Sequence, residues 1–149
     1  MWIDGFLKVP GIAGPSTRAG HEDEIDVHGL VWAMEAPRDT TSLARVGRPR
    51  FDPVVVTKYY DMSSPYLAKA LEDGRRFDEV VVTVRHGADD GGDDRLVVTL
   101  TDAALTRCAL QPAADDSGRI EEQLAFTYAS LGFTFQGGHA VTLTVTTRR

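Results

Sequence analysis

The sequence contains one cysteine, Cys108, among its 149 residues. No intrachain disulfide is therefore possible, and nothing in the chain requires an oxidising compartment. The amino-terminal stretch has no basic region followed by a long apolar run, which argues against a secretory signal peptide. No apolar run approaches the roughly 18 residues that a membrane-spanning helix needs. We expect a cytoplasmic protein that is not inserted in a membrane and is secreted, if at all, by dedicated machinery.

Sequence motifs of catalysis are also missing. There is no G-x-S-x-G, H-E-x-x-H, phosphate-binding loop or paired-carboxylate motif. Cys108 lies in an apolar run without a neighbouring histidine, which favours a buried structural thiol over a nucleophile. His21 and His28 have no third ligand at a fixed spacing, so an exposed polar strand edge is favoured over a metal site. We predict no enzyme activity, no cofactor and no metal.

The net charge of −6 disfavours nucleic-acid binding, but the charges are unevenly distributed. Residues 87–94, GADDGGDD, form an acidic segment with hairpin-turn composition. The segment lacks the residue order of an EF-hand, so a solvated hairpin tip is favoured over a calcium site. Its four candidate contact residues are Asp89, Asp90, Asp93 and Asp94.

Residues 36–50, APRDTTSLARVGRPR, have neither a strand period nor a helix period. Loops of this length within compact domains are usually functional or disordered. The loop is basic because of four arginines: Arg38, Arg45, Arg48 and Arg50. We predict that it contacts an acidic surface of another copy, formed by residues 89–94 and 115–116. Such head-to-tail contacts close into rings or grow into filaments.

Most of the remaining chain alternates apolar and polar residues, as half-buried strands do. The expected strands cover residues 2–9, 22–34, 54–60, 77–86, 95–110, 120–135 and 139–146. This pattern predicts a mainly β fold, an antiparallel β-barrel or two-sheet sandwich, in a single domain spanning residues 1–149.

Two details concern the last strands. The apolar residues switch from even positions, ending at Tyr128, to odd positions, starting at Leu131. A strand that keeps one face buried needs an extra residue there, so we predict a bulge or bend at residues 129–132. Gly137 and Gly138 predict a hairpin turn, after which Val141, Leu143 and Val145 should face inward.

One short helix is predicted over about residues 64–73. Ser64 is a suitable N-cap, Pro65 suits the first helical position, and Gly74 suits a left-handed C-terminal cap. Leu67 and Leu71 lie four residues apart, on one apolar face. Because so short a helix is not stable alone in water, this face must pack against the sheet or barrel.

Four segments form a set of motifs in a fixed order. Residues 56–67 read VTKYYDMSSPYL, residues 6–14 read FLKVPGIAG, residues 21–27 read HEDEIDV and residues 121–128 read EEQLAFTY. All four segments resemble motifs of the Hcp family. Residues 56–67 resemble its F-T-K-x-x-D-x-S-[ST]-P-x-L signature, and residues 6–14 resemble its opening strand, F-[IL]-K. Residues 21–27 resemble its H-x-x-E-I-x-V segment, and residues 121–128 resemble its E-x-ϕ-x-F-x-ϕ strand. Members of this family are the haemolysin-coregulated tube proteins of bacterial type VI secretion. The resemblance covers nearly the whole chain.

The resemblance implies a structural protein rather than an enzyme. Its subunits would form hexameric rings that stack into the inner tube of a contractile injection apparatus, with effectors carried in the lumen. The implied partners are further copies of the chain, sheath, spike and baseplate proteins, and effector cargo. The arginine-rich loop 36–50 departs from the family pattern, which is often rich in glycine and serine there.

An alternative is a monomeric β-barrel module that binds a small ligand or carbohydrate. Such a module needs a concave, aromatic-lined site. Trp2, Trp32 and Tyr66 are the candidate platforms.

Overall fold

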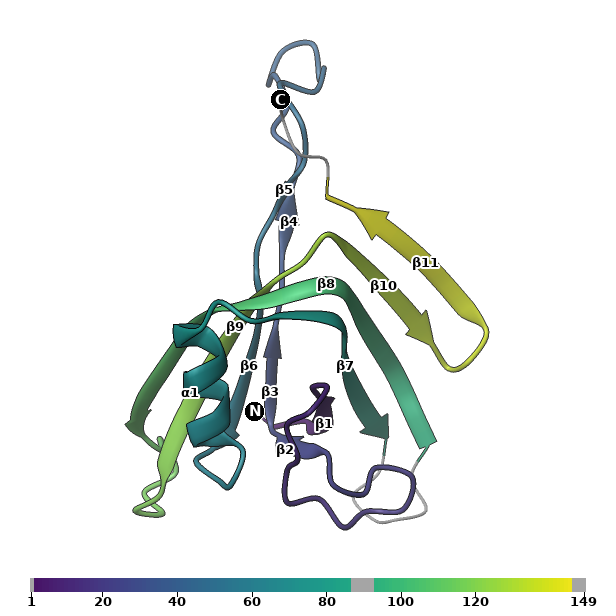
Figure 1. Cartoon of the computed structure of the whole chain (residues 1–149). Coiled ribbons are helices and arrows are strands. Elements are labelled where there is room, and N and C mark those ends of the chain that lie inside the picture. The colour runs from purple at the N-terminus through teal and green to yellow at the C-terminus, as the bar shows by residue number, and fades with distance from the viewer. Residues whose placement is uncertain (1, 87–92, 146–149) are drawn as a thin grey trace.

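The computed structural model describes residues 2–86 and 93–145, and these residues form an antiparallel β structure with one helix (Figure 1). The predicted mainly β class is confirmed. In chain order the elements are β1 (Asp4–Lys8), β2 (Ile25–Val27), β3 (Gly29–Val31), β4 (Met34–Glu35), β5 (Arg50–Phe51), β6 (Val54–Tyr59), α1 (Ser64–Glu72), β7 (Arg76–His86), β8 (Asp93–Pro112), β9 (Ile120–Thr127), β10 (Ser130–Phe135) and β11 (His139–Thr144).

The main sheet closes on itself at His28. Its strand order is β2-β1-β7-β8-β9-β6-β3, and its two end strands, β2 and β3, are consecutive in the chain. The His28 N–H donates to the Thr57 carbonyl of β6 at 2.8 Å, and the His28 carbonyl accepts from the Ile3 N–H at 3.0 Å. The sheet is therefore a small barrel. Gly29 is required beside this junction, because a Cβ there would lie 2.9 Å from the Cβ of Thr57.

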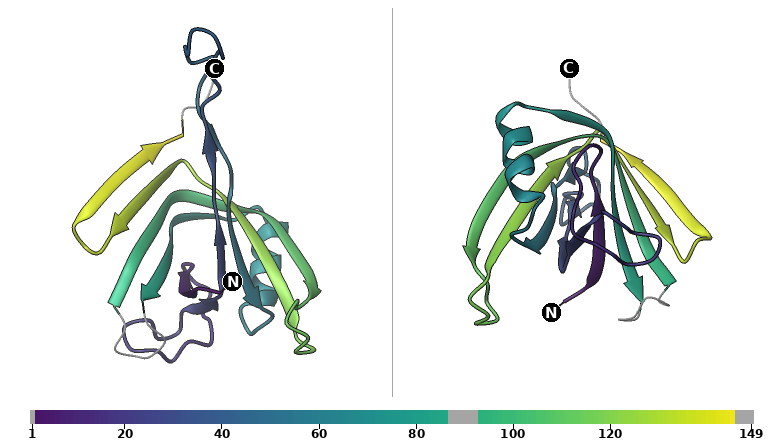
Figure 2. Two further views of the ribbon diagram at one scale, coloured as in Figure 1. Left: turned by 180° about the vertical axis from the view of Figure 1, so that it is seen from behind. Right: turned by 60° about the horizontal axis from the view of Figure 1, so that its bottom comes forward.

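Strand β8, twenty residues long, connects the barrel to a projecting hairpin. Its first half pairs with β7 on one side and β10 on the other, and its second half pairs with β9. Strands β10 and β11 form a hairpin that extends the sheet outward, on the side away from α1 (Figure 2).

The predicted bend between residues 129 and 132 is confirmed. Strand β9 ends at Thr127 and β10 begins at Ser130, with both strands still paired to β8. Tyr128 and Leu131 are both buried, as the switch of apolar positions requires. The two-residue interruption turns the chain while it keeps the apolar side chains in the core.

The prediction that Val141 faces inward is wrong. Its side chain is 59% exposed, whereas Leu143 and Val145 are only partly buried. The reason is topological, because among the described residues β11 pairs with β10 alone and no second layer covers the hairpin. Alternation along a strand predicts which residues share a face, but it does not show whether anything covers that face.

Helix α1 packs on the barrel through Leu67, which is fully buried, and Leu71, which is partly buried. Gly74 ends the helix with φ = +65°, and its N–H donates to the Leu71 carbonyl at 3.1 Å, as the sequence predicted. The start differs by one residue, because Ser63 and not Ser64 is the N-cap, and Pro65 lies in the first turn. No helix in the described part of the chain could cross a membrane.

The Ser64 hydroxyl is instead part of a buried ion-pair network that joins α1 to β6 and β9. The Lys58 Nζ donates to Glu122 Oε1 and to Ser64 Oγ, both at 2.8 Å, and lies 3.1 Å from Asp61 Oδ1. Lys58 and Glu122 are fully buried. Ser64 Oγ also donates to Glu122 at 2.8 Å, so each charged group has several partners. Segment 56–67 therefore supplies Lys58, Asp61 and Ser64, which link α1 and β6 to β9.

We expect that Lys58→Met destabilises the fold by about 3–5 kcal/mol, because it leaves the Glu122 carboxylate buried without its cation. The measurement is urea denaturation followed by circular dichroism. The double variant Lys58→Met/Glu122→Leu removes both charges and should recover much of the loss. The control Lys69→Met breaks an exposed ion pair and should leave the denaturation midpoint close to that of the wild type. A Lys58→Met midpoint equal to that of the wild type would contradict the role of the network.

Candidate functional site

The two histidines considered as metal ligands have separate partners inside the fold. His21 stacks on Phe6, with ring centroids 4.3 Å apart, and its Nδ1 lies 2.8 Å from Glu24 Oε1. His28 stacks on Trp2, and its Nε2 lies 2.9 Å from Glu121 Oε2. The expected exposed strand edge is wrong, because aromatic rings and carboxylates cover both imidazoles. Among the described residues no three histidine, cysteine or acidic side chains could hold a metal ion.

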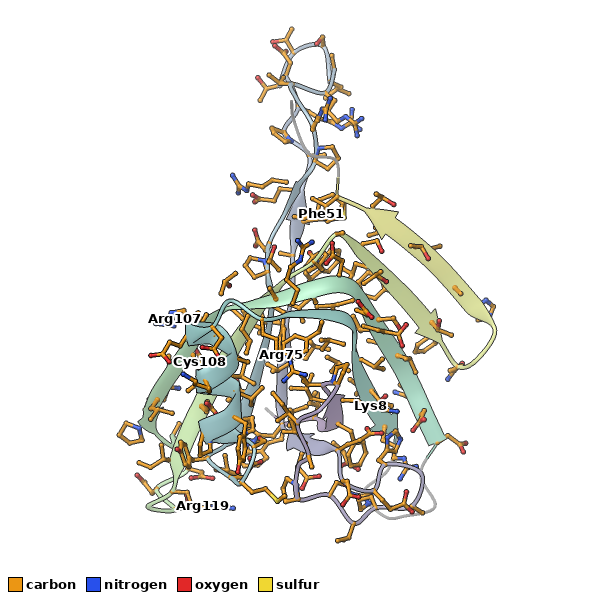
Figure 3. The ribbon with its side chains drawn as sticks, in the orientation of Figure 1. Lys8, Phe51, Arg75, Arg107, Cys108 and Arg119 are labelled. Atoms are coloured by element: carbon orange, nitrogen blue, oxygen red, sulfur yellow. The ribbon has the colours of Figure 1, made fainter. Side chains whose placement is uncertain are left out.

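Cys108 lies half-buried on β8, on the flank that also holds α1 (Figure 3). Burial raises the pKa of its thiol, and the Glu122 carboxylate raises it further, while Lys58 opposes both effects. A thiol with a raised pKa is a poor nucleophile because little thiolate is present. The thiol is only half-buried, not buried as the sequence predicted.

The acidic segment offers less free charge than the sequence suggested. Asp89 and Asp90 lie outside the described residues, whereas Asp93 and Asp94 are exposed at the start of β8. The Asp94 carboxylate accepts a hydrogen bond from Arg85 Nε at 3.2 Å and lies 3.1 Å from His21 Nε2. Asp94 is therefore engaged within its own subunit.

Residues 36–50 form an ordered projection that rises from the barrel beyond β4 and β5 (Figures 1 and 2). The Asp39 carboxylate accepts hydrogen bonds from the N–H groups of Thr41, at 2.7 Å, and Ser42, at 2.9 Å. These N–H groups lower the pKa of Asp39. The Leu43 N–H donates to the Asp39 carbonyl at 2.9 Å, and the Asp39 N–H donates to the Ala44 carbonyl at 2.8 Å. The tip thus has its own hydrogen-bonded framework.

Two of the four predicted contact arginines serve this framework. Arg38 donates to the Leu43 carbonyl at 2.9 Å, and Arg50 pairs with Glu35. Arg45 and Arg48 are exposed on the tip. Sequence reasoning missed the apolar part of the tip, where Leu43 is 68% and Val46 60% exposed. An aperiodic segment gives no signal for the direction of its side chains; the only clue was two large apolar residues beside Arg45.

A cleft of about 430 Å³ opens at the other end of the barrel, where β6 ends. Its walls combine three rings with three carboxylates, from residues Trp2, His28, Tyr59, Asp4, Asp26 and Asp61. The Trp2 ring is 55% exposed. These residues are far apart in the sequence, and the closure of the sheet at His28 brings them together.

The carboxylates of the cleft differ in their partners. Asp4 forms a two-pronged ion pair with Arg18, with distances of 3.2 and 3.1 Å. Asp61 accepts from the Ser63 N–H at 2.8 Å and lies near Lys58. No described residue donates a hydrogen bond to Asp26. Burial raises the pKa of Asp26 and the charge of Asp61 raises it further, while the Arg18 guanidinium opposes both effects.

The aromatic residues proposed as a ligand platform do not form one surface. Trp2 lines the cleft, but Trp32 and Tyr66 do not. The Trp32 indole N–H donates to the Tyr128 hydroxyl at 2.7 Å, and its ring packs near Phe133. Tyr66 is exposed on α1. A carbohydrate site built from these three rings is therefore not formed.

The turn between β8 and β9 is fixed at the cleft end of the barrel. The Arg119 guanidinium lies 3.7 Å from the centroid of the Tyr59 ring (Figure 3). The Tyr59 hydroxyl donates a hydrogen bond to Asp115 Oδ2. This bond and those from Ser117 lower the pKa of Asp115 to about 2.

Comparison with known proteins gives a consistent family. A sequence model described as "Type VI secretion system effector, Hcp" matches residues 6–135. The "Major exported protein" of Pseudomonas aeruginosa is 32% identical over 92 residues, which is 62% of this chain and 54% of that protein. The chain thus matches about half the length of this relative. "Protein hcp1" of the same organism is 23% identical over 140 residues, which is 91% of this chain and 85% of that protein.

A solved structure has the same fold. The crystal structure titled "Hcp protein" superposes with a TM-score of 0.83 at 24% sequence identity. The match covers 95% of this chain and 98% of that one.

We expect the Asp115 carboxyl to titrate at about pH 2, below its ordinary pKa of 3.8. Since the folded pKa is depressed, the stabilisation is complete above the ordinary value and is lost as the pH falls through about 2. Carboxyl carbon NMR of the folded protein measures the midpoint. Tyr59→Phe removes the main hydrogen bond and should raise the midpoint toward 3.8. An unchanged midpoint in this variant would contradict the assignment.

Proposed function

The chain belongs to the Hcp family of type VI secretion system effectors, and from this premise we propose that it is a tube subunit whose hexameric rings stack into the inner tube of a contractile injection apparatus. The expectation that it is not an enzyme agrees with membership of a family of secreted structural proteins. The observation that most supports the proposal is that two apolar projections, the β10–β11 hairpin and the loop 36–50, stand off the barrel uncovered.

The hairpin is suited to contacts within a ring. Within the described part of the chain strand β11 pairs only with β10, which leaves its other edge open, and the exposed side chains of Val141 and Phe135 lie on the hairpin. An open, apolar strand edge is a surface that pairs with or packs against another chain. A contact between this hairpin and a different surface of the next copy is heterologous, and six such contacts related by rotation close a ring.

The loop is suited to contacts between rings. It projects from one end of the barrel, and the start of β8, with Asp93, lies at the other end (Figure 1). Identical copies facing the same way would bring the basic loop of one toward the acidic end of the next. Charged, partly solvated contacts of this kind associate reversibly, as a tube that comes apart after delivery requires.

The resemblance supplies the remaining parts of the proposal. Effector cargo would occupy the lumen, and sheath, spike and baseplate proteins would be the other partners. Secretion fits the name of the relative called "Major exported protein".

We expect the purified protein to sediment as a ring of about six subunits. Val141→Asp should shift it to monomers, because a charge on the hairpin cannot be buried without a partner. Val46→Asp is the matched control, an equally exposed valine on the stacking loop, and should leave single rings intact. Analytical ultracentrifugation measures both. A monomeric wild type at high concentration would contradict the proposal.

Reversing Arg45 and Arg48 to glutamate should weaken ring stacking and leave the fold unchanged, because both side chains are exposed. Negative-stain microscopy counts stacked and single rings, and thermal melting by circular dichroism checks the fold. Equal stacking by the variant and the wild type would show that charge on the loop does not hold rings together.

A further inference from the structure

The tip of loop 36–50 contains a strained residue, Leu43, whose side chain is exposed. Leu43 has φ = +63°, a conformation that costs energy for any residue with a Cβ. Its side chain nevertheless points into solvent, with Val46 exposed beside it. The hydrogen bonds from Arg38 to the Leu43 carbonyl and from the Leu43 N–H to Asp39 hold this conformation. The framework of the loop thus presents an apolar side chain to the outside.

The Trp2 cleft is complementary to this tip in two respects. The exposed Trp2 ring offers an apolar surface that matches Leu43 and Val46. Asp26 is a carboxylate without a hydrogen-bond donor in the described part of the chain, and Arg45 is an exposed cation. Burial and the charge of Asp61 raise the pKa of Asp26 although the Arg18 guanidinium opposes them, and a second guanidinium placed there would relieve the repulsion further.

The two surfaces lie at opposite ends of the same strand. Loop 36–50 returns to the barrel through β5 and enters β6 at Val54. Strand β6 ends at Tyr59, which lines the cleft. Figure 1 shows the loop at the top and the β6 end at the bottom. Two copies in the same orientation can therefore bring the loop of one to the cleft of the next.

We propose that the loop of one copy docks in the Trp2 cleft of the next copy, with Leu43 and Val46 against Trp2 and Arg45 beside Asp26. This inference rests on the proposed stacking of rings and names a receiving surface other than the acidic segment 87–94. Asp94 in that segment is already engaged by Arg85 and His21, whereas no hydrogen bond from a described residue reaches Asp26, on which the Arg18 guanidinium acts only through its charge. The occupant of the cleft is thus a second copy of this chain, not a small ligand.

Disulfide trapping tests the contact directly, because Cys108 is the only cysteine. In a Cys108→Ala background, Leu43→Cys is combined with Thr17→Cys, on the wall of the cleft, or with Asp93→Cys, at the acidic segment. After mild oxidation the first pair should give a ladder of linked subunits on a denaturing gel. The second pair should not. Leu43→Cys alone should give at most dimers.

Charge exchange tests the energetic coupling. Asp26→Arg and Arg45→Asp should each weaken ring stacking about tenfold or more, and the double variant should restore much of it. Asp93→Asn removes an acidic charge at the same end and should stack as the wild type does. Leu43→Gly relieves the strained backbone, so its melting temperature should be equal or higher while its stacking falls.

The outcomes separate this inference from the proposed function. Stacked rings without the Thr17 ladder, or with a ladder from the Asp93 pair instead, overturn the docking and leave the tube subunit standing. A Thr17 ladder from a protein that forms no rings supports the docking and overturns the ring. Full stacking by Asp26→Arg or Leu43→Gly also overturns the docking.

Discussion

Lys58 and Glu122 meet inside the barrel, and much of the fold depends on their contact. Two charges removed from water are tolerated only when their partners are well placed, and here Ser64 and Asp61 complete the set. These residues come from β6, the connection between β6 and α1, α1 itself and β9, so the network fixes how the helix and two strands meet. The same strand β6 then separates the projecting loop from the Trp2 cleft. A loss of the network would thus disturb the surfaces at both ends.

The sequence predicted the elements of the fold better than its surfaces. Alternating valines predicted the strands, and the segment from Pro65 to Gly74 predicted the helix. Both predictions were possible because each signal lies within one short stretch of sequence. The bend after Tyr128 was also predictable, since the apolar positions change parity there. The exposure of Val141 was not, because it depends on the absence of a covering layer. The cleft was missed because Trp2, Asp26 and Asp61 meet only after the sheet has closed.

The candidate surfaces show why charge counts alone were insufficient. Four arginines suggested a basic loop, yet Arg38 and Arg50 are used inside it, and the framework they support exposes Leu43 and Val46. Four aspartates suggested an acidic patch, yet Asp94 is engaged by Arg85. Sequence distance conceals such internal pairing, because the partners of these side chains are set by tertiary contacts.

The length of β8 has a mechanical consequence. One continuous backbone runs from the hairpin side of the molecule to the flank beside α1, hydrogen-bonded to neighbours along its whole course. A force applied along β8 at the hairpin would act as shear on its inter-strand hydrogen bonds, and many of these bonds would share the load at once. Such an arrangement resists deformation far better than a row of bonds that open one after another.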